Sequence, residues 1–468
     1  MGKGTGPSRN ASAEGSFMSD KARFQGRLRQ MFGSVGFVVI VAFLVRTGFL
    51  YYYFHSVVQR IILDNPPFGF EAGSVAAAIA QGRGFSSPLR MVRTGPTVWF
   101  TPIYPYLLAG VFKLFGVFSY TSSLVIRCID NAFSACTCWP IYAIGAKAFN
   151  KRVGAAAAWI WVLLPMSLFF STVWVWDTAL STLMLALIVV TTFNLRGSER
   201  LSAWMGYGAL WAAGSMVNPA PVSVLPPLAL WALWPLLRSR LASASRLVLA
   251  SSLIFAAGIT PWTIRNYVVF GKFIPFRSNF ALELWLGNNP AVPDSWSPWL
   301  HPDDDPSEAA KYARMTEIPY MQEKQQEAVR FIRTHPLDTL NFTLHRFSNN
   351  WLGMDQAPTD LWSHVPLQVK LIMVGNCVFA LLSLLGALFA YREQNEAALP
   401  LALLMLLFPL LFYFTHASTR YRHPMDPIML VLAVYALAYA GAYLLKRFSG
   451  LESRQVIRLT NTRSQMPN

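Results

Sequence analysis

Two carboxylates stand where acid–base chemistry at a membrane surface would need them. Glu71 falls in the first turn of a short predicted helix near 68–82, just after the first long apolar run. Partial burial there would raise its proton affinity, as a general base requires. Asp177 follows Trp174 and Trp176 in a short joint between two apolar runs, and such tryptophans are typical of the lipid headgroup region. Plainer explanations exist: Glu71 can complement a helix dipole, and Asp177 can cap the next helix.

Three arginines are predicted on the same side of the membrane as these acids, where cations are uncommon. Arg265 ends one apolar run, and Arg420 and Arg422 precede the last one. A guanidinium group binds phosphate oxygens through two parallel hydrogen bonds. The arginines therefore indicate a site for an anionic lipid headgroup, with snorkelling to ordinary membrane phosphates as the alternative.

The elements that carry these residues must be solvated largely by lipid. Of the 468 residues, 54% are hydrophobic and 13% are charged, against about a quarter charged in soluble proteins. Runs that can cross about 30 Å of hydrocarbon predict an all-α integral membrane protein with about ten transmembrane helices. These runs lie near 33–54, 121–146, 153–172, 178–195, 201–217, 220–236, 246–264, 367–391, 398–414 and 426–446.

The basic residues indicate the topology. The formal net charge is +16, but Lys and Arg gather in the tails and in short joints such as 147–152. This is the pattern of cytoplasmic loops, so both termini are expected inside the cell and no nucleic-acid partner is expected. An odd number of crossings must then separate residue 55 from 147, so the apolar run 99–116 should lie along the outer interface.

Five segments follow from this topology. A disordered basic cytoplasmic tail spans 1–31, and a transmembrane module spans 32–264 and contains a first outer loop at 55–120. A helical second outer loop covers 265–366, with an expected helix start at Asp305-Pro306, a break at Pro319 and an amphipathic helix over 337–351. Transmembrane helices resume at 367–446, and 447–468 is a basic cytoplasmic tail.

Other polar residues have structural explanations. Arg46 either snorkels outward or faces a polar site, and Arg127 can pair with Asp130 three residues later. The acidic run 303–305 lacks the spacing of a calcium loop and is interpreted as a helix cap and solvated surface. The four cysteines are expected to be buried free thiols. No metal site or other cofactor is predicted, although a divalent cation remains compatible.

The order of several short motifs resembles the GT-C glycosyltransferases that use polyprenyl-phosphate sugars. The bacterial members similar to protein O-mannosyltransferases and to the lipid A aminoarabinose transferase are the nearest in pattern. The motifs are Glu71 with Gly82-Arg-Gly84-Phe85, Thr94-Gly-Pro-Thr97, Thr101-Pro-Ile-Tyr104-Pro105, Trp176-Asp177, Pro261-Trp-Thr-Ile-Arg265-Asn266-Tyr267, Trp285-Leu-Gly287-Asn-Asn289-Pro290 and Arg420-Tyr-Arg422-His-Pro424. The resemblance implies that Glu71 is the catalytic carboxylate and Asp177 a second acid. Ala72 stands where many members have an adjacent second acid.

The chemistry of such a transfer suits these residues. A polyprenyl phosphate is a good leaving group, so the protein must supply a base for the acceptor hydroxyl and cations for the departing phosphate. One direct displacement inverts the anomeric centre. Glu71 and Asp177 are the predicted catalytic residues, and Arg265, Arg420 and Arg422 the predicted phosphate ligands. The predicted further substrate contacts are Tyr104, Asn266, Tyr421 and His423.

The expected partners are a polyprenyl-phosphate sugar, membrane lipids and a glycan, lipid or protein acceptor. The expected location is a prokaryotic inner membrane with the active site on the outer face. Two alternatives stay open. A flippase or transporter for lipid-linked oligosaccharides would use the same basic cluster, and a polymerase or ligase of surface polysaccharide would share substrate and location.

Overall fold

Helices account for almost all the regular structure of this protein. The computed structural model describes residues 34–55, 68–293, 296–353 and 367–449. No strand forms within these ranges, where one isolated bridge pairs Ser86 with Pro96. The all-α fold class is confirmed. The predicted tails at 1–31 and 447–468 lie outside the described residues, except that the last helix reaches Ser449.

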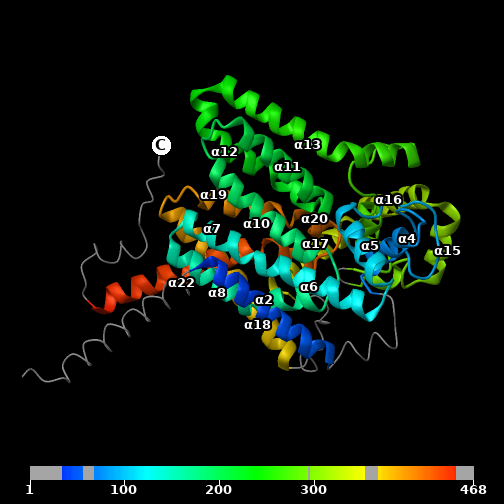
Figure 1. The fold of residues 1–468 in the computed structure, drawn as a ribbon, viewed down its shortest axis with the longest axis horizontal. Helices are drawn as coiled ribbons and strands as arrows, with labels where there is room; N and C mark the ends of the chain where they lie inside the picture. Colours follow the sequence, from blue (N-terminus) through cyan, green and yellow to red (C-terminus); the bar gives the residue numbers. More distant parts are fainter. Residues whose placement is uncertain (1–33, 56–67, 294–295, 354–366, 450–468) are drawn as a thin grey trace, which may run out of the picture.

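A bundle of apolar helices forms most of the molecule (Figure 1). Its helices are α2 (Val35–Tyr53), α6 (Tyr120–Cys136), α7 (Cys138–Ala148), α8 (Lys151–Leu163), α9 (Pro165–Thr172), α10 (Thr178–Leu195), α11 (Leu201–Val217), α12 (Leu225–Ser239), α13 (Leu241–Phe270), α18 (Leu367–Arg392), α19 (Ala398–Leu407), α20 (Leu410–Phe414) and α22 (Asp426–Ser449). Six described helices are long and apolar enough to cross a membrane, or seven if α8 and α9, bent by 52°, form one span. The protein is an integral membrane protein, while the count of about ten spans stays a prediction.

Several predicted spans are broken, and proline explains two of the breaks. The run 121–146 is divided into α6 and α7, where Pro140 has no N–H to donate to the carbonyl four residues earlier. Pro165 likewise leaves the carbonyl of Trp161 without a helical partner. Arg46 and the Ser167 hydroxyl donate to this carbonyl at 3.1 and 2.9 Å.

Arg46 is therefore a structural residue of the bundle. Its side chain is fully buried and also donates to Ser134 and Ser167 at 2.9 and 3.0 Å. Of its two predicted environments, the polar site is right and snorkelling is wrong, because the broken helix supplies acceptors. The expected pairing of Arg127 with Asp130 is wrong as well. Arg127 donates to the carbonyl of Thr172 at 2.9 Å, and Asp130 accepts from the Tyr104 hydroxyl at 3.0 Å.

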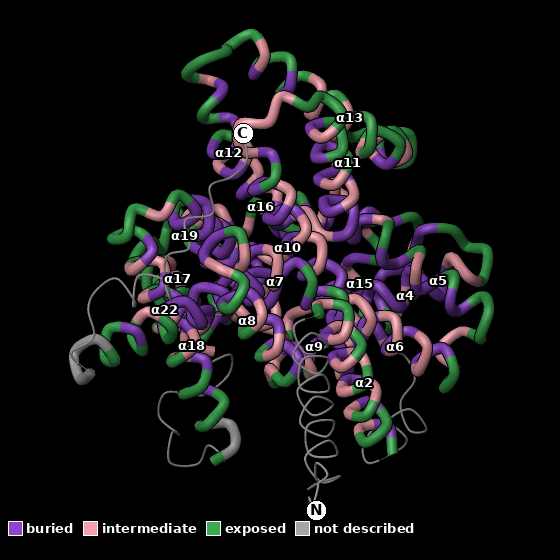
Figure 2. The backbone as a smooth tube through the Cα atoms, turned by 60° about the vertical axis from the view of Figure 1, so that its left-hand side comes forward, coloured by how far each residue is buried: buried purple, intermediate pink, exposed green. Residues whose placement is uncertain are grey.

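The two long loops fold together into a helical lobe at one end of the bundle (Figure 1). The first contributes α4 (Phe70–Ala80) and α5 (Ile103–Phe115). The second contributes α14 (Phe280–Gly287), α15 (Pro306–Met315) and α16 (Glu317–Thr334), while its last helix, α17 (Pro336–Leu352), packs against α18 and α20 of the bundle (Figure 2). With 13 residues, α5 is about 20 Å long and too short to cross the hydrocarbon layer.

Local signals in the second loop are largely confirmed. The Asp305 side chain caps α15 by accepting from the N–H of Ser307 at 2.8 Å. The break expected at Pro319 is instead at Thr316, whose φ of 66° ends α15 and starts α16. Pro319 is tolerated in the first turn of α16, where its missing N–H would have no helical acceptor.

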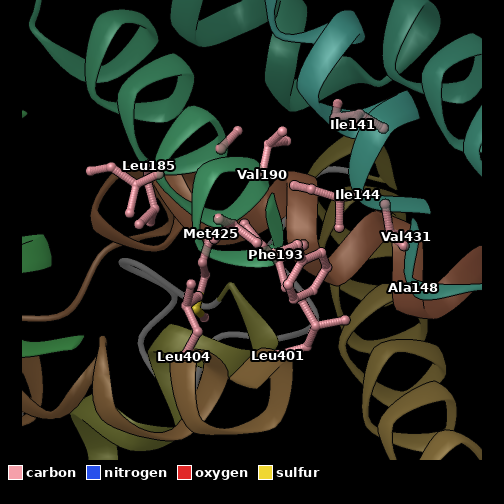
Figure 3. Close-up of a cluster of buried hydrophobic side chains, with 14 of the residues drawn as sticks. Ile141, Ile144, Ala148, Leu185, Val190, Phe193, Leu401, Leu404, Met425 and Val431 are labelled. Carbon is pink, nitrogen blue, oxygen red and sulfur yellow. The ribbon is translucent and has the colours of Figure 1, made fainter. Parts of the chain in front are cut away.

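Two large apolar cores stabilise the bundle and the helical lobe. The larger lies inside the bundle, where residues of α7, α10, α19 and α22 interlock, among them Ile144, Phe193, Leu404 and Val431 (Figure 3). The smaller joins the two loops, since buried side chains of α4 and α5 pack with those of α14, α15 and α16. Burial is deepest at the centre of the molecule, whereas α13 is mostly exposed along the edge of the bundle (Figure 2).

Candidate active site

A cavity of about 560 Å³ lies where the helical lobe meets the bundle. Its walls come from the start of α4, the joint before α10, the segment 276–283 and the joint before α22. Four residues predicted from the sequence line it: Glu71, Asp177, Arg420 and Tyr421. Segments separated by up to 350 positions in the sequence thus supply one site.

Glu71 is placed by the turn that opens α4. Gly69 adopts a φ of +83°, a conformation that favours glycine, and the helix begins at the next residue. Glu71 is 8% exposed, and its Oε1 lies 3.2 Å from Nε2 of His301. Its Oε2 is buried and has no hydrogen-bond partner among the described residues. Burial raises the pKa of Glu71, with His301 opposing the rise and Asp303 adding to it.

Asp177 occupies the N-cap position of α10, but its carboxylate makes no capping hydrogen bond within the described chain. It accepts instead from the side-chain amide of Asn218 at 3.2 Å. Burial raises the pKa of Asp177 to about 6, although Arg277 and Arg420 act against the rise. The carboxylate is therefore directed toward the cavity's charged groups, and helix capping does not account for it.

Cations and aromatic rings also line the cavity. The guanidinium carbon of Arg420 lies 4.1 Å from the ring centre of Trp176 and 5.4 Å from that of Trp174. Its Nη2 donates to the hydroxyl of Tyr421 at 2.7 Å. Arg277 also lines the cavity, yet it makes no hydrogen bond or ion pair with the described residues. Two arginines, of which Arg420 lies over aromatic rings, suit an anionic group such as a phosphate.

Two other predicted arginines are placed elsewhere. Arg265 donates to the carbonyls of Thr97 and Phe85 at 2.7 and 3.0 Å and so ties α13 to the first loop. Arg422 is 1% exposed and donates to Asp426 and to the carbonyl of Asn350. Backbone carbonyls and an acid, all within the fold, thus occupy donors that were expected to face phosphate.

Three predicted substrate contacts also have internal partners. The Tyr104 hydroxyl donates to Asp130 at 3.0 Å. His423 Nδ1 lies 2.8 Å from Asp426, and the side-chain amide of Asn266 donates to the carbonyl of Ile274 at 2.9 Å. The structure therefore brings Tyr421 to the cavity and leaves these three in supporting contacts.

The sequence analysis missed the charged residues that the second loop brings to the cavity. Asp303 accepts from the backbone N–H and Nε of Arg90 at 2.7 and 3.0 Å, and this pair clamps the two loops together. The expectation that 303–305 is solvated surface is wrong for Asp303, which is 6% exposed. Glu283 lies 3.4 Å from His416, and both line the cavity with His301. Only a surplus of acids and histidines in one loop could have drawn attention to them.

No group of three or more histidines, cysteines or acids in the described ranges is close enough to hold a metal ion. The cavity is lined instead by Glu71, one of whose carboxylate oxygens is buried without a partner, and by a second acid, two arginines and several aromatic residues. This arrangement can accept a proton, hold an anionic group and stack against a sugar ring.

Comparison with known proteins agrees with the fold. Residues 99–264 match the family model described as dolichyl-phosphate-mannose-protein mannosyltransferase. The chain superposes on the archaeal oligosaccharyltransferase AglB from Archaeoglobus fulgidus with a TM-score of 0.50 and 12% identity, over 89% of this chain and 51% of that one. It therefore spans about half the length of that enzyme. The structure of ArnT from Cupriavidus metallidurans bound to undecaprenyl phosphate matches over 92% of this chain and 81% of that one at 11% identity, but its TM-score of 0.32 carries no weight.

No curated protein sequence matches the chain. The AglB superposition agrees with the all-helical membrane fold described above. Residues 99–264 are thus similar to the dolichyl-phosphate-mannose-protein mannosyltransferase family, and the chain shares the membrane fold of AglB.

Proposed function

We propose that this protein transfers a sugar from a polyprenyl-phosphate donor to an acceptor hydroxyl, with inversion and with Glu71 as the general base. The observation that carries this proposal is the Oε2 atom of Glu71, which is buried at the cavity without a hydrogen-bond partner among the described residues. A buried acceptor of this kind costs free energy unless a ligand completes it. An acceptor hydroxyl would donate to it.

The reaction needs one proton transfer and one displacement. Glu71 Oε2 takes the hydroxyl proton as the oxygen attacks the anomeric carbon, and the bond from that carbon to the phosphate oxygen breaks. Negative charge then grows on the phosphate. Arg277 and Arg420, which both line the cavity, would stabilise it. These two replace Arg265 and Arg422 in the proposal, because the internal contacts of the latter pair already engage them.

Asp177 would hold the sugar. Its pKa of about 6 leaves it ionised at neutral pH, so it can accept hydrogen bonds from sugar hydroxyls. The rings of Phe70, Trp174 and Trp176 lie together beside it, with centroids 4.9 to 5.4 Å apart for the two contacts of Phe70. Aromatic faces of this type stack against the apolar face of a pyranose or furanose.

A lipid-linked donor also fits a second concavity on the bundle. This groove of about 750 Å³ is lined mostly by apolar residues of α5, α11 and α13, with Arg265 among its lining residues. Its walls lie on helices that lipid would surround, so an isoprenoid chain could occupy it. In the predicted topology, the cavity and the end of the groove near Arg265 lie at the outer face of a prokaryotic inner membrane.

Transfer of labelled sugar from a panel of polyprenyl-phosphate sugars to candidate acceptors tests the proposal, with the full chain in lipid nanodiscs. Glu71→Gln should lower turnover by about 10²- to 10⁴-fold, the usual contribution of a general base. Glu323→Gln is the matched control, since Glu323 pairs with Lys311 on the surface of the second loop. Full activity of Glu71→Gln would refute the base. Donor lipid that changes leaflet without being consumed would favour a flippase.

A further inference from the structure

Glu71, the base of the proposed reaction, lies on the first loop but is contacted by a histidine of the second loop. Oε1 of Glu71, on α4 of the first loop, lies 3.2 Å from Nε2 of His301, in the second loop. Counted without their backbone atoms, the side chains of Glu71 and His301 are 11% and 12% exposed. The proposed mechanism uses only Oε2, so the role of the contact at Oε1 is separate from it.

The proton on His301 can be assigned from its other ring nitrogen. The backbone N–H of Asp303 donates to Nδ1 of His301 at 3.1 Å. A nitrogen that accepts a hydrogen bond carries no proton, so the hydrogen of the neutral ring resides on Nε2. The nitrogen that carries the hydrogen is therefore the one that lies 3.2 Å from Oε1 of Glu71. This contact with the positive end of the N–H dipole favours the ionised carboxylate.

We infer that His301 is the positioning residue for the general base: as the Nε2–H tautomer it holds Oε1 of Glu71, so that Oε2 faces the cavity, ionised and free to accept the substrate proton. This inference rests on Glu71 as the base of the proposed transfer. His301 itself gains and loses no proton in the cycle. Its fixed tautomer sets the orientation and the charge of the carboxylate.

Further contacts keep His301 in place. Its ring packs edge-on against Trp99, with centroids 5.8 Å apart. Its backbone carbonyl accepts from the N–H groups of Asp304 and Asp305, both at 2.8 Å. The neighbouring Asp303 is clamped to Arg90 of the first loop. The base is thus completed only when the two loops are docked, because one supplies the carboxylate and the other the imidazole.

The charged groups around Glu71 determine in which direction its pKa moves when His301 is removed. Asp303 from the second loop and Glu283 from α14 oppose its ionisation, as burial does. Arg420, from the joint before α22, interacts with Glu71 and favours the charged form. His301 is the neighbour that contacts the carboxylate directly. Its removal should therefore leave Glu71 protonated up to a higher pH.

The test compares His301→Leu, which removes the donor, with His301→Gln, whose side-chain amide can still donate to Oε1. His335→Leu is the control, since His335 is exposed and contacts Thr334 and Phe331 on α16. The first readout needs no sugar donor. Dicyclohexylcarbodiimide modifies protonated buried carboxyl groups, so mass spectrometry of the peptide containing Glu71 across a pH series gives the labelling midpoint.

We expect the midpoint to move to higher pH in His301→Leu, and to lie nearer that of the unmodified protein in His301→Gln and His335→Leu. With a donor that the protein consumes, kcat of His301→Leu should fall roughly ten- to hundredfold, the range for one lost hydrogen bond to a charged group. The acidic limb of its pH profile should shift upward, and His301→Gln should partly restore both.

An unchanged midpoint in His301→Leu would overturn the inference. So would lowered activity with an unmoved acidic limb, which is the result of a purely structural role. Failure of the proposed function looks different: Glu71→Gln would keep its activity, whether or not the labelling midpoint depends on His301.

Discussion

Glu317 is the residue whose substitution tests the structural argument most sharply. It is 3% exposed and starts α16 directly after the left-handed Thr316. Its carboxylate accepts from the N–H of Val98 at 2.9 Å, the hydroxyl of Ser278 at 2.6 Å and that of Tyr312 at 2.8 Å. A further short bond comes from the Thr97 hydroxyl. One side chain therefore joins the first loop, the segment after α13 and α15.

These bonds position the cavity wall, because Val98 precedes Trp99 and Ser278 follows Arg277. Burial raises the pKa of Glu317 despite its donors, so the ionised group is held at a cost. In Glu317→Gln, the amide oxygen can accept from Val98 and Ser278 while the NH₂ donates to the two other hydroxyls. The local free energy of unfolding should then stay within about 1 kcal/mol of the original value.

Glu317→Leu should lower the local free energy of unfolding much more than Glu317→Gln does. The hydroxyl groups can turn to other acceptors, but the N–H of Val98 is fixed, and an orphaned buried donor costs about 1–3 kcal/mol. With the weakened contacts of Ser278 and Tyr312, we expect about 3 kcal/mol in total, less than the 3–5 kcal/mol of a broken buried ion pair.

Hydrogen exchange measures this effect directly. A local loss of about 3 kcal/mol makes amides near Val98 and Ser278 exchange roughly a hundredfold faster. Peptides from α22, which does not contact Glu317 through any bond above, serve as the internal control. Equal exchange in Glu317→Leu and the original protein, or equally fast exchange in Glu317→Gln and Glu317→Leu, would refute the reasoning.

Three further predictions follow from the site and its packing. Asp177→Asn should stabilise the protein by up to about 3 kcal/mol at pH 8, because the raised pKa of about 6 means that ionisation of Asp177 disfavours the folded state. This gain in stability should shrink as the pH falls through 6 towards 4, and thermal unfolding across a pH series measures it. Arg277→Gln should lower kcat/KM roughly ten- to hundredfold with only a small fall in melting temperature, since Arg277 makes no hydrogen bond with the described residues and acts on Asp177 through its charge alone. Gly287→Ala should destabilise the protein by more than about 2 kcal/mol, because the added Cβ would lie 1.9 Å from the carbonyl oxygen of Thr415. Gly110→Ala should be tolerated in the same melting assay, because a Cβ there would have no other atom within 4 Å.

Each of the three has a result that would contradict it. A stability gain for the asparagine variant that is the same at pH 4 and pH 8 would mean that ionisation is not the cause. A large drop in melting temperature for the glutamine variant would make that arginine structural. Equal stability of the two alanine variants would remove the argument from close packing.

Much of the fold could be predicted because lipid solvation acts through composition. Long apolar runs, a low charged fraction and basic joints were sufficient to indicate an all-α membrane protein. Local signals also succeeded where a few adjacent residues determine the outcome, as in the Asp305 cap of α15 and the helix α17. The positions at which the helices break were harder to predict. Whether a proline ends a helix depends on distant partners for the freed carbonyl, such as Arg46 for that of Trp161.

The candidate site was only half accessible from the sequence. Glu71, Asp177, Arg420 and Tyr421 could be selected because each lies beside an apolar run, at a position where a polar group must meet the membrane surface. Arg265 and Arg422 have the same local pattern but bind internal carbonyls and Asp426, and residue type and spacing do not distinguish the two cases.

By itself, then, the sequence determined that lipid solvates the protein and that its elements are helices, since both depend on composition and on short-range order. Only the tertiary structure decided which polar groups meet. Asp303 and Arg90 are 213 positions apart, and His301 is separated from Glu71 by a comparable length of chain. Contacts at such separations arise from the docking of two loops through a shared apolar core. Hydrogen-bond geometry requires placement within a fraction of an ångström, which no local periodicity specifies.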